Sequence, residues 1–546
     1  MSEPLQCATD RPDDACCRAK SPWLQGRSVV DMGSRRTSRP GVTPRVSMPR
    51  ATRRYDRPVG DREFVARVRR HTPASFVPLV AELGAAHSDR SMWMKPMGIT
   101  PWALAELARV SLVLGTDFNR SAATLSDVID CVNAYKQLTD PDLHRQKPGA
   151  VGDFLMRTAA QQLVYQRQAY YDLARSVAIF ERTKVVREEK LKVAAAGWDR
   201  ELFGCSLGDY LNTAFVLHVG ALRNVGMFDP TWIDQPQFEG ITRLIGTDIL
   251  STMHAHFVAD RALLAATERD TQERVGRPTL EYRQFGFNPL SQFPVVSGLG
   301  ERWFIPVPDL VLRKASPLGL FYSGLERWGK AFADDIGPLF EAYIGDQLRE
   351  LDATVLPEIK FGPAKQPELS VDWFVVFDEC VLLIEAKSAR PTEAIRWGGP
   401  NARQELERIL AKGIKQLTKS AKRVIDGDPQ FAAIPADRPV IGLVVTMEPF
   451  HVVNTPFVAT TLPECSIPYR VCSAEEIEGL VGLLVPDGAN LGALLLEHMT
   501  DPDRDGHSIK VLIENKEMRR NRILDEAWAS FEWPNPEALP EHGPAT

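Results

Sequence analysis

The stretch 369–391, LSVDWFVVFDECVLLIEAKSARP, constrains the fold more than any other part of the chain. It contains two short apolar runs, 371–377 and 381–384, which flank the polar pair Asp378 and Glu379. Both runs are rich in Val, Ile, Leu and Phe with little alternation, which is typical of strands covered on both faces. The polar break between them is short enough for a hairpin. We therefore predict two buried, paired strands.

Three charged residues lie in or beside these runs: Asp372, Glu385 and Lys387. An unpaired charge is costly to bury, so each needs an opposite charge, a metal ion or water. Glu385 and Lys387 are two residues apart and therefore point to the same face of one strand. If the strands pair as a hairpin, Asp372 can lie beside Glu385. Two carboxylates that converge with one ammonium group predict a site for a hard divalent cation, with the lysine beside the reacting water.

The same residues carry a resemblance to a known family. Asp372, twelve intervening residues and the Glu-Ala-Lys tripeptide at 385–387 resemble the signature of the PD-(D/E)XK nuclease superfamily, which has the restriction-endonuclease-like fold. Val371 stands where the name motif has Pro. The resemblance is confined to about residues 337–480. The alternative interpretation is a strand pair that ends in a surface Glu–Lys couple, with Asp372 as a turn residue.

The resemblance implies hydrolysis of a phosphodiester bond. Asp372, Glu385 and the carbonyl oxygen of Ala386 would hold Mg²⁺ (or Mn²⁺), since Mg²⁺ prefers oxygen ligands. Lys387 would orient the attacking water or stabilise the charge of the transition state. The expected substrate is DNA, or else RNA, in defence or nucleic-acid processing. The rival hypothesis is a catalytically inactive nuclease-like fold that serves as a nucleic-acid-binding or protein-assembly module.

Two further residues match positions that assist catalysis in the superfamily. Glu341 lies at the flank of the apolar stripe of a predicted helix over 337–351, where an acid can reach over a sheet edge and help to hold a metal ion. An ordinary surface Glu is the alternative. Gln416 lies at the border of the apolar stripe of a predicted helix over 402–425, and some members use such a Gln to orient the lysine or the substrate. Their companion Tyr is replaced here by Ser420.

The elements predicted around these residues follow one order: a helix, three strands, a long helix and a further strand. Their bounds are 337–351, 354–361, 371–377, 381–384, 402–425 and 439–446, with a fifth strand at 469–472 and a helix that begins at a capping box over 473–476. This order matches the αβββαβ core and mixed sheet of the resembling superfamily. It does not depend on the charged motif, so it supports the resemblance independently.

The predicted helix over 402–425 also carries a stripe of cations nearly opposite its apolar side. We call this the basic stripe; its members are Arg408, Lys412, Lys415, Lys419 and Lys422. A solvated helix face explains such a stripe by default. The functional alternative is a row of contacts to nucleic-acid phosphates.

The length of 546 residues suggests a multidomain protein. The first 60 residues lack apolar periodicity and hold twelve Lys and Arg against six Asp and Glu, which indicates disorder. We predict a disordered basic extension over 1–60, a helical domain of unknown role over 61–295, a connector with short strands over 296–336, the nuclease-like module over 337–485, C-terminal helices over 486–532 and a disordered tail over 533–546.

Within the helical domain, Thr100 and Pro101 indicate the start of a helix, as an N-cap followed by Pro in the first turn. The segment 241–267 is also predicted to be helical. The domain carries no catalytic signature. It could serve as a surface for a protein partner or a homodimer.

Composition limits the setting and the kind of contact with nucleic acid. The net charge of −6 means that any such contact must be local. The eight cysteines include no CxxC pair, so we expect reduced thiols and a cytoplasmic location. No apolar run reaches the roughly 18 residues that a membrane span needs, so no membrane partner is expected.

Overall fold

The computed structural model describes residues 58–88, 98–118, 121–144, 149–165, 169–185, 191–245, 248–396, 398, 401–485 and 490–534. All of them belong to one compact unit, Pro49–Thr546. The protein is mainly helical and contains a five-stranded mixed sheet, a four-stranded sheet and a two-stranded sheet. Among the described residues, no helix combines the length and apolar character needed to cross a bilayer.

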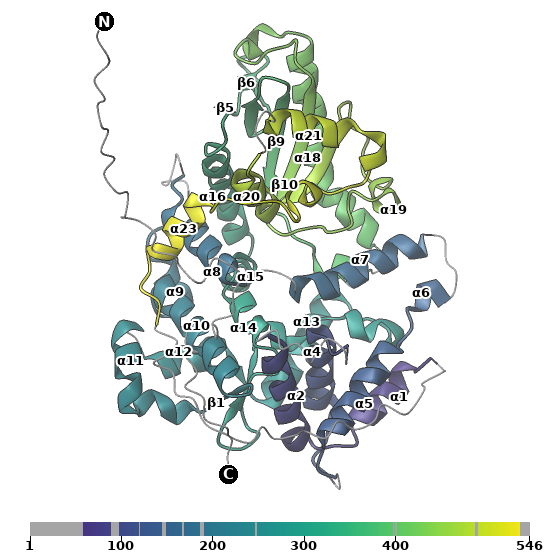
Figure 1. The fold of residues 1–546 in the computed structure, drawn as a ribbon, viewed down its shortest axis with the longest axis vertical. Helices are drawn as coiled ribbons and strands as arrows, with labels where there is room; N and C mark the ends of the chain where they lie inside the picture. Colours follow the sequence, from purple (N-terminus) through teal and green to yellow (C-terminus); the bar gives the residue numbers. More distant parts are fainter. Residues whose placement is uncertain are drawn as a thin grey trace, which may run out of the picture. The chain divides into compact units, whose positions relative to one another are not determined.

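The five-stranded sheet has the order β11-β10-β9-β8-β5 (Figure 1). Its strands are β5 (Thr354–Pro357), β8 (Trp373–Val376), β9 (Val381–Lys387), β10 (Val440–Thr446) and β11 (Tyr469–Ser473). The first three pair antiparallel in chain order, while β10 is parallel to both β9 and β11. The sheet is therefore mixed, as predicted, and the hairpin of β8 and β9 is confirmed.

Helices cover both faces of this sheet. On one face lies α18 (Ala402–Ile425), whose apolar stripe packs on alternate residues of β8, β9 and β10, such as Phe374, Leu383 and Val444. The other face meets α16 (Lys330–Leu348), where Gly345 makes room for the indole of Trp373. The bounds of α18 agree with the predicted helix, because its apolar side chains recur with helical spacing throughout.

Two elements of this region differ from their predicted bounds. The strand predicted over 354–361 is divided: β5 pairs with β8, whereas β6 (Lys360–Phe361) pairs with β7 (Glu368–Leu369) in the two-stranded sheet. The helix α16 begins at Lys330, seven residues before the predicted start, and contains Pro338. The capping box at Ser473 is present and opens α20 (Ala474–Gly482).

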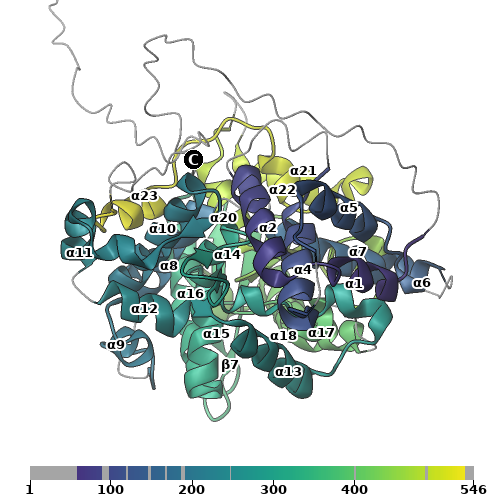
Figure 2. The same cartoon turned by 90° about the horizontal axis from the view of Figure 1, so that it is seen from below.

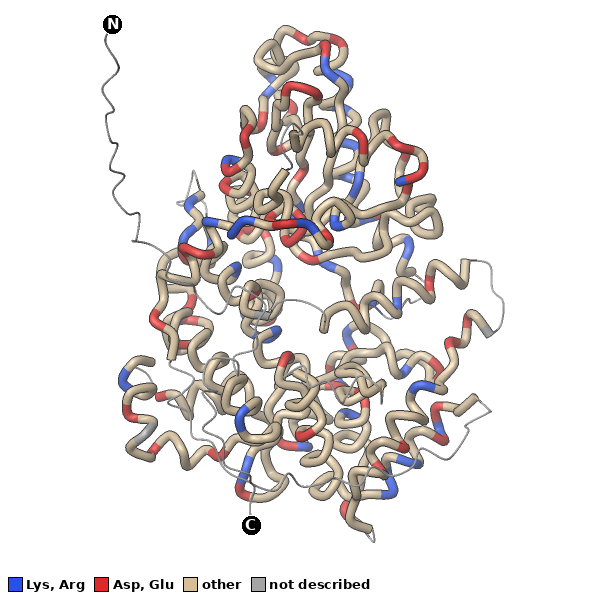
Figure 3. Tube along the Cα trace, viewed as in Figure 1, with Lys and Arg blue, Asp and Glu red and all other residues tan. Residues whose placement is uncertain are grey.

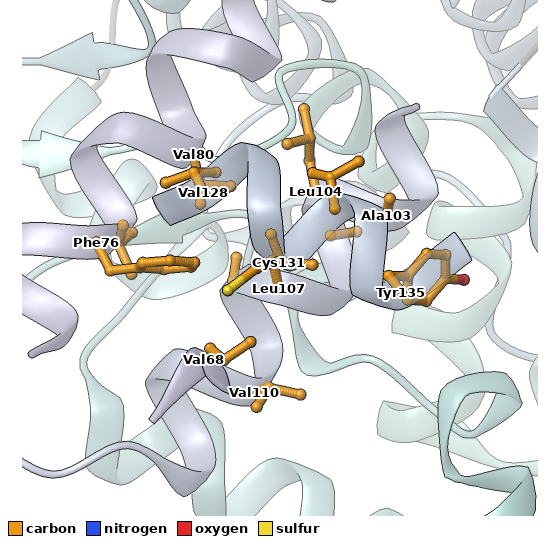
Figure 4. Close-up of a cluster of buried hydrophobic side chains, with 14 of the residues drawn as sticks. Val68, Phe76, Val80, Ala103, Leu104, Leu107, Val110, Val128, Cys131 and Tyr135 are labelled. Atoms are coloured by element: carbon orange, nitrogen blue, oxygen red, sulfur yellow. The ribbon is translucent and has the colours of Figure 1, made fainter. Parts of the chain in front are cut away.

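The N-terminal helices share a separate apolar core, shown in Figure 4, in which Phe76, Leu104, Leu107 and Val132 are fully buried. Thr100 and Pro101 begin α4 as predicted. The helices of this part, with a π-helical turn at Val110–Leu114, are α1 (Asp61–Val68), α2 (Pro73–Ser88), α4 (Pro101–Arg109), α5 (Leu125–Lys136), α6 (Pro141–His144), α7 (Ala150–Gln162), α8 (Ala169–Val177), α9 (Trp198–Phe203) and α10 (Leu207–Arg223).

The helix predicted over 241–267 is wrong as one element. The structure has α11 (Glu239–Ile245), α12 (Ile249–His256) and α13 (Arg261–Val275), with the short strand β2 (Val258–Ala259) before α13. Two aspartates explain the division. Asp248 caps α12 by accepting a hydrogen bond from the N–H of Ser251, and Asp260 caps α13 by accepting one from the N–H of Leu263.

The segment predicted as a connector is mostly helical. It contains β4 (Trp303–Phe304), which pairs with β1 (Met227–Phe228) and β3 (Val295–Val296) in the four-stranded sheet. It also contains α14 (Asp309–Lys314) and α15 (Pro317–Trp328). Ser316 accepts a hydrogen bond from the N–H of Gly319, and Pro317 follows it, so a helix start was present in the sequence and was missed.

The two terminal segments predicted to be disordered lie almost wholly outside the described residues. Of those that are described, Val59 is buried and pairs with Leu138, and the indole of Trp533 stacks on Trp528. The predicted disorder therefore does not apply to these two residues. All five cysteines of the described part are free.

Candidate active site

The hairpin of β8 and β9 places Asp372 opposite Glu385. The ladder ends at the pair of Trp373 and Ile384, and the two acids are the next residues beyond it, close enough for the charge of Asp372 to act on Glu385. Residues opposite each other in a ladder point to the same face, and here it is the face that α18 covers. One carboxylate oxygen of Asp372 accepts a hydrogen bond of 2.7 Å from the N–H of Ala386, next to the carbonyl predicted as a metal ligand.

Lys387 lies on the same face, two residues after Glu385. Its ammonium group forms an ion pair with Oε1 of Glu385, and 23% of its side chain is exposed. Its second contact, of 3.5 Å, is with Oε1 of Gln416 on α18. The ammonium group of Lys387 therefore contacts the buried acid, while part of the side chain is exposed to solvent, from which a substrate can arrive.

Glu385 is fully buried, and no donor of the described residues binds its second oxygen, Oε2. The helix α18 approaches it closely at Gly413, where a Cβ atom would lie 3.3 Å from Cγ of Glu385. Burial and the nearby charge of Asp372 raise the pKa of Glu385 to about 8. Burial also raises the pKa of Asp372, although the ammonium group of Lys387 opposes that rise. Two acids whose ionised forms are disfavoured in this way would be stabilised by a cation between them.

Two polar residues of α18 hold the start of β8. Ser420 accepts a hydrogen bond of 3.0 Å from the N–H of Val371, and Nε2 of Gln416 donates one of 3.3 Å to the carbonyl of Ser370. Gln416 thus contacts both Lys387 and the segment that leads to Asp372. It lies where the sequence predicted, at the border of the apolar stripe.

Glu341 comes from α16, on the other face of the sheet. Its main-chain carbonyl accepts a hydrogen bond from Nε1 of Trp373. Burial, followed by the charges of Asp372 and Glu358, raises the pKa of its carboxyl group to about 7, while Lys387 opposes the rise. Glu341 is therefore within electrostatic reach of Asp372 and Lys387.

Two residues near the acids were not predicted as part of the site. Glu358 follows β5, and burial together with Asp372 raises its pKa. Lys412, predicted only as a member of the basic stripe, acts to lower the pKa of both Asp372 and Glu385, so it lies within electrostatic reach of both. Glu358 lacked a sequence signal. Lys412 could have been placed near the site from the sequence, since it precedes Gln416 by one helical turn.

The members of the basic stripe differ in whether an acidic residue already pairs with them. Arg408 donates two hydrogen bonds, of 2.7 and 2.8 Å, to Glu405, and Lys419 forms an ion pair with Glu368. Lys412, Lys415 and Lys422 are exposed. Figure 3 shows that acidic and basic residues are interspersed along the described chain, in keeping with a local contact rather than a wholly basic surface.

The donor set limits how a metal ion could be held. Within the described part of the chain, no group of three or more His, Cys, Asp or Glu side chains is gathered closely enough to hold a metal ion. An ion here would take the two carboxylates of Asp372 and Glu385, a main-chain oxygen and water, and Mg²⁺ commonly keeps several waters. The buried Oε2 of Glu385, which lacks a donor, fits that use. Glu341 as a ligand stays a prediction.

Comparisons of the chain with known protein families, with curated proteins and with solved structures found no match.

Proposed function

We propose that this protein is a metal-dependent nuclease with a restriction-endonuclease-like module. The observation that carries the proposal is the convergence of Asp372, Glu385 and Lys387 on one face of the sheet, with a buried carboxylate oxygen that lacks a donor. The order α16, β5, β8, β9, α18, β10 is the order of helices and strands that the resembling superfamily has, which supports the finer fold assignment. The proposed substrate is DNA.

The residues that would hold the cation are Asp372, Glu385 and the carbonyl of Ala386. Bound there, Mg²⁺ or Mn²⁺ would lower the pKa of a water ligand and neutralise charge on the phosphate. The chain's own contribution is to exclude water from Glu385, through burial under Gly413, and to fix Asp372 through the N–H of Ala386. A rigid acid pair needs little reorganisation when the reaction begins.

Lys387 would supply the positive charge that the transition state needs. Its ion pair with Glu385 and its contact with Gln416 hold the ammonium group at the exposed edge of the site. A phosphate that approached this edge would contact Lys387 first. Lys412, one turn of α18 before Gln416, would add a second cation. Interactions that strengthen as charge develops raise the rate of the chemical step rather than the affinity for substrate.

The test is cleavage of double-stranded DNA, single-stranded DNA and RNA by the full chain, with Mg²⁺ or Mn²⁺ and with EDTA. Lys387→Met should lower the cleavage rate by about 10²-fold or more, as the loss of one transition-state donor does. It should leave Mn²⁺ binding, measured by calorimetry, largely intact. Asp372→Asn should remove both cleavage and Mn²⁺ binding.

The matched control is Asp378→Asn, the same chemical change at the opposite end of β8, where the side chain is 96% exposed. It should behave as the wild type in both assays. Full activity in Lys387→Met would reduce the lysine to a surface residue. Absence of both cleavage and metal binding in the wild type would instead favour an inactive module used for binding or assembly.

A further inference from the structure

A second candidate site lies away from the acid pair, in a cavity of about 270 Å³. Its walls come from α13, α14, α15 and the short helix α17 (Glu393–Arg396), which follows the strand β9. Figure 2 shows α13, α15 and α17 on the same side of the molecule. The volume is near the lower end of what small-ligand pockets have.

The charge of this cavity is positive. Its lining contains two acids, Glu326 and Glu393, and four cations: Arg274, Arg313, Lys314 and Arg396. Glu393 is close to Arg396, at 3.5 Å, and Glu326 accepts a hydrogen bond from Gln292. The lining therefore holds two more cations than acids, while the charge of the buried Glu448 also acts on Arg396.

Lys314 is the most informative of the four cations. Its ammonium group donates a hydrogen bond of 3.3 Å to Oγ of Ser323, and the one acid of the described residues whose charge acts on it is Glu326. Burial lowers its pKa to about 8, and the charge of Glu326 offsets only part of that effect. The side chain of Lys314 is half-buried, and an ammonium group in such a place with one neutral hydrogen-bond partner would be stabilised by an anion.

The remaining wall is largely apolar. Phe287, Leu318, Leu325 and Tyr322 line it. One side of Tyr322 is already engaged, since the guanidinium of Arg390 lies 5.0 Å from its ring centre. The cavity thus offers cations for a charged group and an apolar surface for the body of a ligand.

We propose that this cavity binds a small organic phosphate, with the phosphate at Lys314 and Arg396 and the organic part against Phe287, Leu318 and Leu325. A phosphate matches the excess of cations, because guanidinium and ammonium groups form charge-assisted hydrogen bonds with its oxygens. An organic part is required to cover the apolar wall. The proposal does not depend on nuclease activity.

The experiment is calorimetric titration of the full chain with ADP, glucose 6-phosphate and inorganic phosphate, in EDTA so that a metal ion cannot contribute. At least one of the two organic phosphates should bind at one saturable site, and more tightly than inorganic phosphate. Lys314→Gln should weaken that binding about tenfold or more, the usual effect of removing a charge-assisted hydrogen bond. Lys516→Gln, the same change at an exposed position, should leave it unchanged.

A second variant keeps all four cations. Ser323→Phe places a large side chain in the cavity and should abolish binding while the melting temperature stays near that of the wild type. Arg396→Gln provides a further test if Lys314→Gln does not fold. The proposal is overturned if none of the three probes binds saturably, if inorganic phosphate binds as tightly as both organic phosphates, or if the Lys314 and Ser323 variants bind as the wild type does.

Discussion

Glu385 carries the clearest pH dependence at the scale of single residues. Its pKa is about 8 in the folded protein, against an ordinary value of 4.5. Below pH 4.5 the carboxyl group of Glu385 is protonated in both the folded and the unfolded protein, so it does not lower the free energy of unfolding. Between pH 4.5 and 8 the unfolded chain ionises first, so the folded state loses stability as the pH rises.

We therefore predict that Glu385→Gln reduces the fall in unfolding free energy between pH 5 and pH 8, in the absence of divalent metal. The expected gain at pH 8 is on the order of 1–3 kcal/mol. Urea unfolding in EDTA at both pH values measures it. Glu407→Gln, at an exposed position of α18, is the control and should follow the wild type. An equal fall in wild type and Glu385→Gln would contradict the assignment.

At this scale strand and helix periodicity predicted that Asp372, Glu385 and Lys387 lie together and that Glu341 and Gln416 flank apolar stripes. The roles of these residues in a site stay predictions. Ser420 was noted only as a replacement for Tyr, and its bond to the N–H of Val371 could not be foreseen. That bond depends on how α18 lies over β8. Glu358 was missed for the same reason, since only the packed sheet brings it near Asp372.

At the scale of elements, the close approach of α18 to β9 is concentrated at Gly413. A Cβ atom there would meet Cγ of Glu385 and Cγ1 of Val444, both at 3.3 Å. We predict that Gly413→Ala lowers the proposed nuclease activity more than it changes stability. The helix gains up to about 1 kcal/mol from Ala in place of Gly, which offsets the tighter contact, while the displaced Glu385 no longer faces Asp372 correctly.

The control is Gly240→Ala in α11, where nothing lies within 4 Å of the new Cβ atom. It should raise the unfolding free energy by about 0.5–1 kcal/mol and leave activity unchanged. Steady-state cleavage and urea unfolding measure the two quantities. A Gly413→Ala protein that is both more stable and fully active would show that α18 tolerates a side chain over Glu385.

The basic stripe of α18 gives a prediction about binding. Changing Lys412, Lys415 and Lys419 together to Gln should weaken DNA binding and flatten its salt dependence, by about 0.7–0.9 in log–log slope for each phosphate that the variant no longer binds. Lys419 should contribute least because Glu368 already pairs with it. Titrations at several salt concentrations, in the Lys387→Met background, measure the slope, and the melting temperature should change little.

Arg408→Gln is the matched control for this prediction, because Glu405 already binds that guanidinium through two hydrogen bonds. Its slope should stay close to that of the Lys387→Met parent. An unchanged slope in the triple variant would assign the stripe to solvent.

Elements with strong, uninterrupted periodicity were predicted well, and α18 is the clearest case. Errors arose where local caps interrupt a broadly apolar segment. Asp248 and Asp260 are the N-caps at which α12 and α13 begin, and the spacing of apolar residues alone hides both. The division of β5 from β6 has a different cause. The two strands pair with different partners, β5 with β8 and β6 with β7, and this pairing is decided only in the folded chain.

At the scale of the whole molecule, a buried ion pair ties the helical part to the sheet module. Arg175 of α8 donates hydrogen bonds of 2.5 and 2.6 Å to the two oxygens of Glu478 on α20, and Tyr343 of α16 donates another of 2.6 Å. Arg175→Met should cost about 3–5 kcal/mol of unfolding free energy, because it removes the cation that pairs with two buried carboxylates, Glu478 and Asp172. Urea unfolding followed by Trp fluorescence measures the decrease.

The double variant Arg175→Met with Glu478→Met should recover part of that stability, since Glu478 is then no longer buried without its cation, while Asp172 still loses its ion pair with Arg175. The control is Arg243→Met, which removes a largely exposed ion pair with Glu239 and should have little effect. A small decrease in the single Arg175 variant would indicate that the helical part is held by apolar packing instead.

The sheet order has a consequence for behaviour at high concentration. The edge strand β5 is only four residues long and ends at Pro357, which has no N–H to offer a neighbouring strand. At the opposite edge, β11 is almost entirely buried. Short, proline-terminated or covered edges are how folded proteins avoid joining sheet to sheet. The five-stranded sheet should therefore resist aggregation through strand addition.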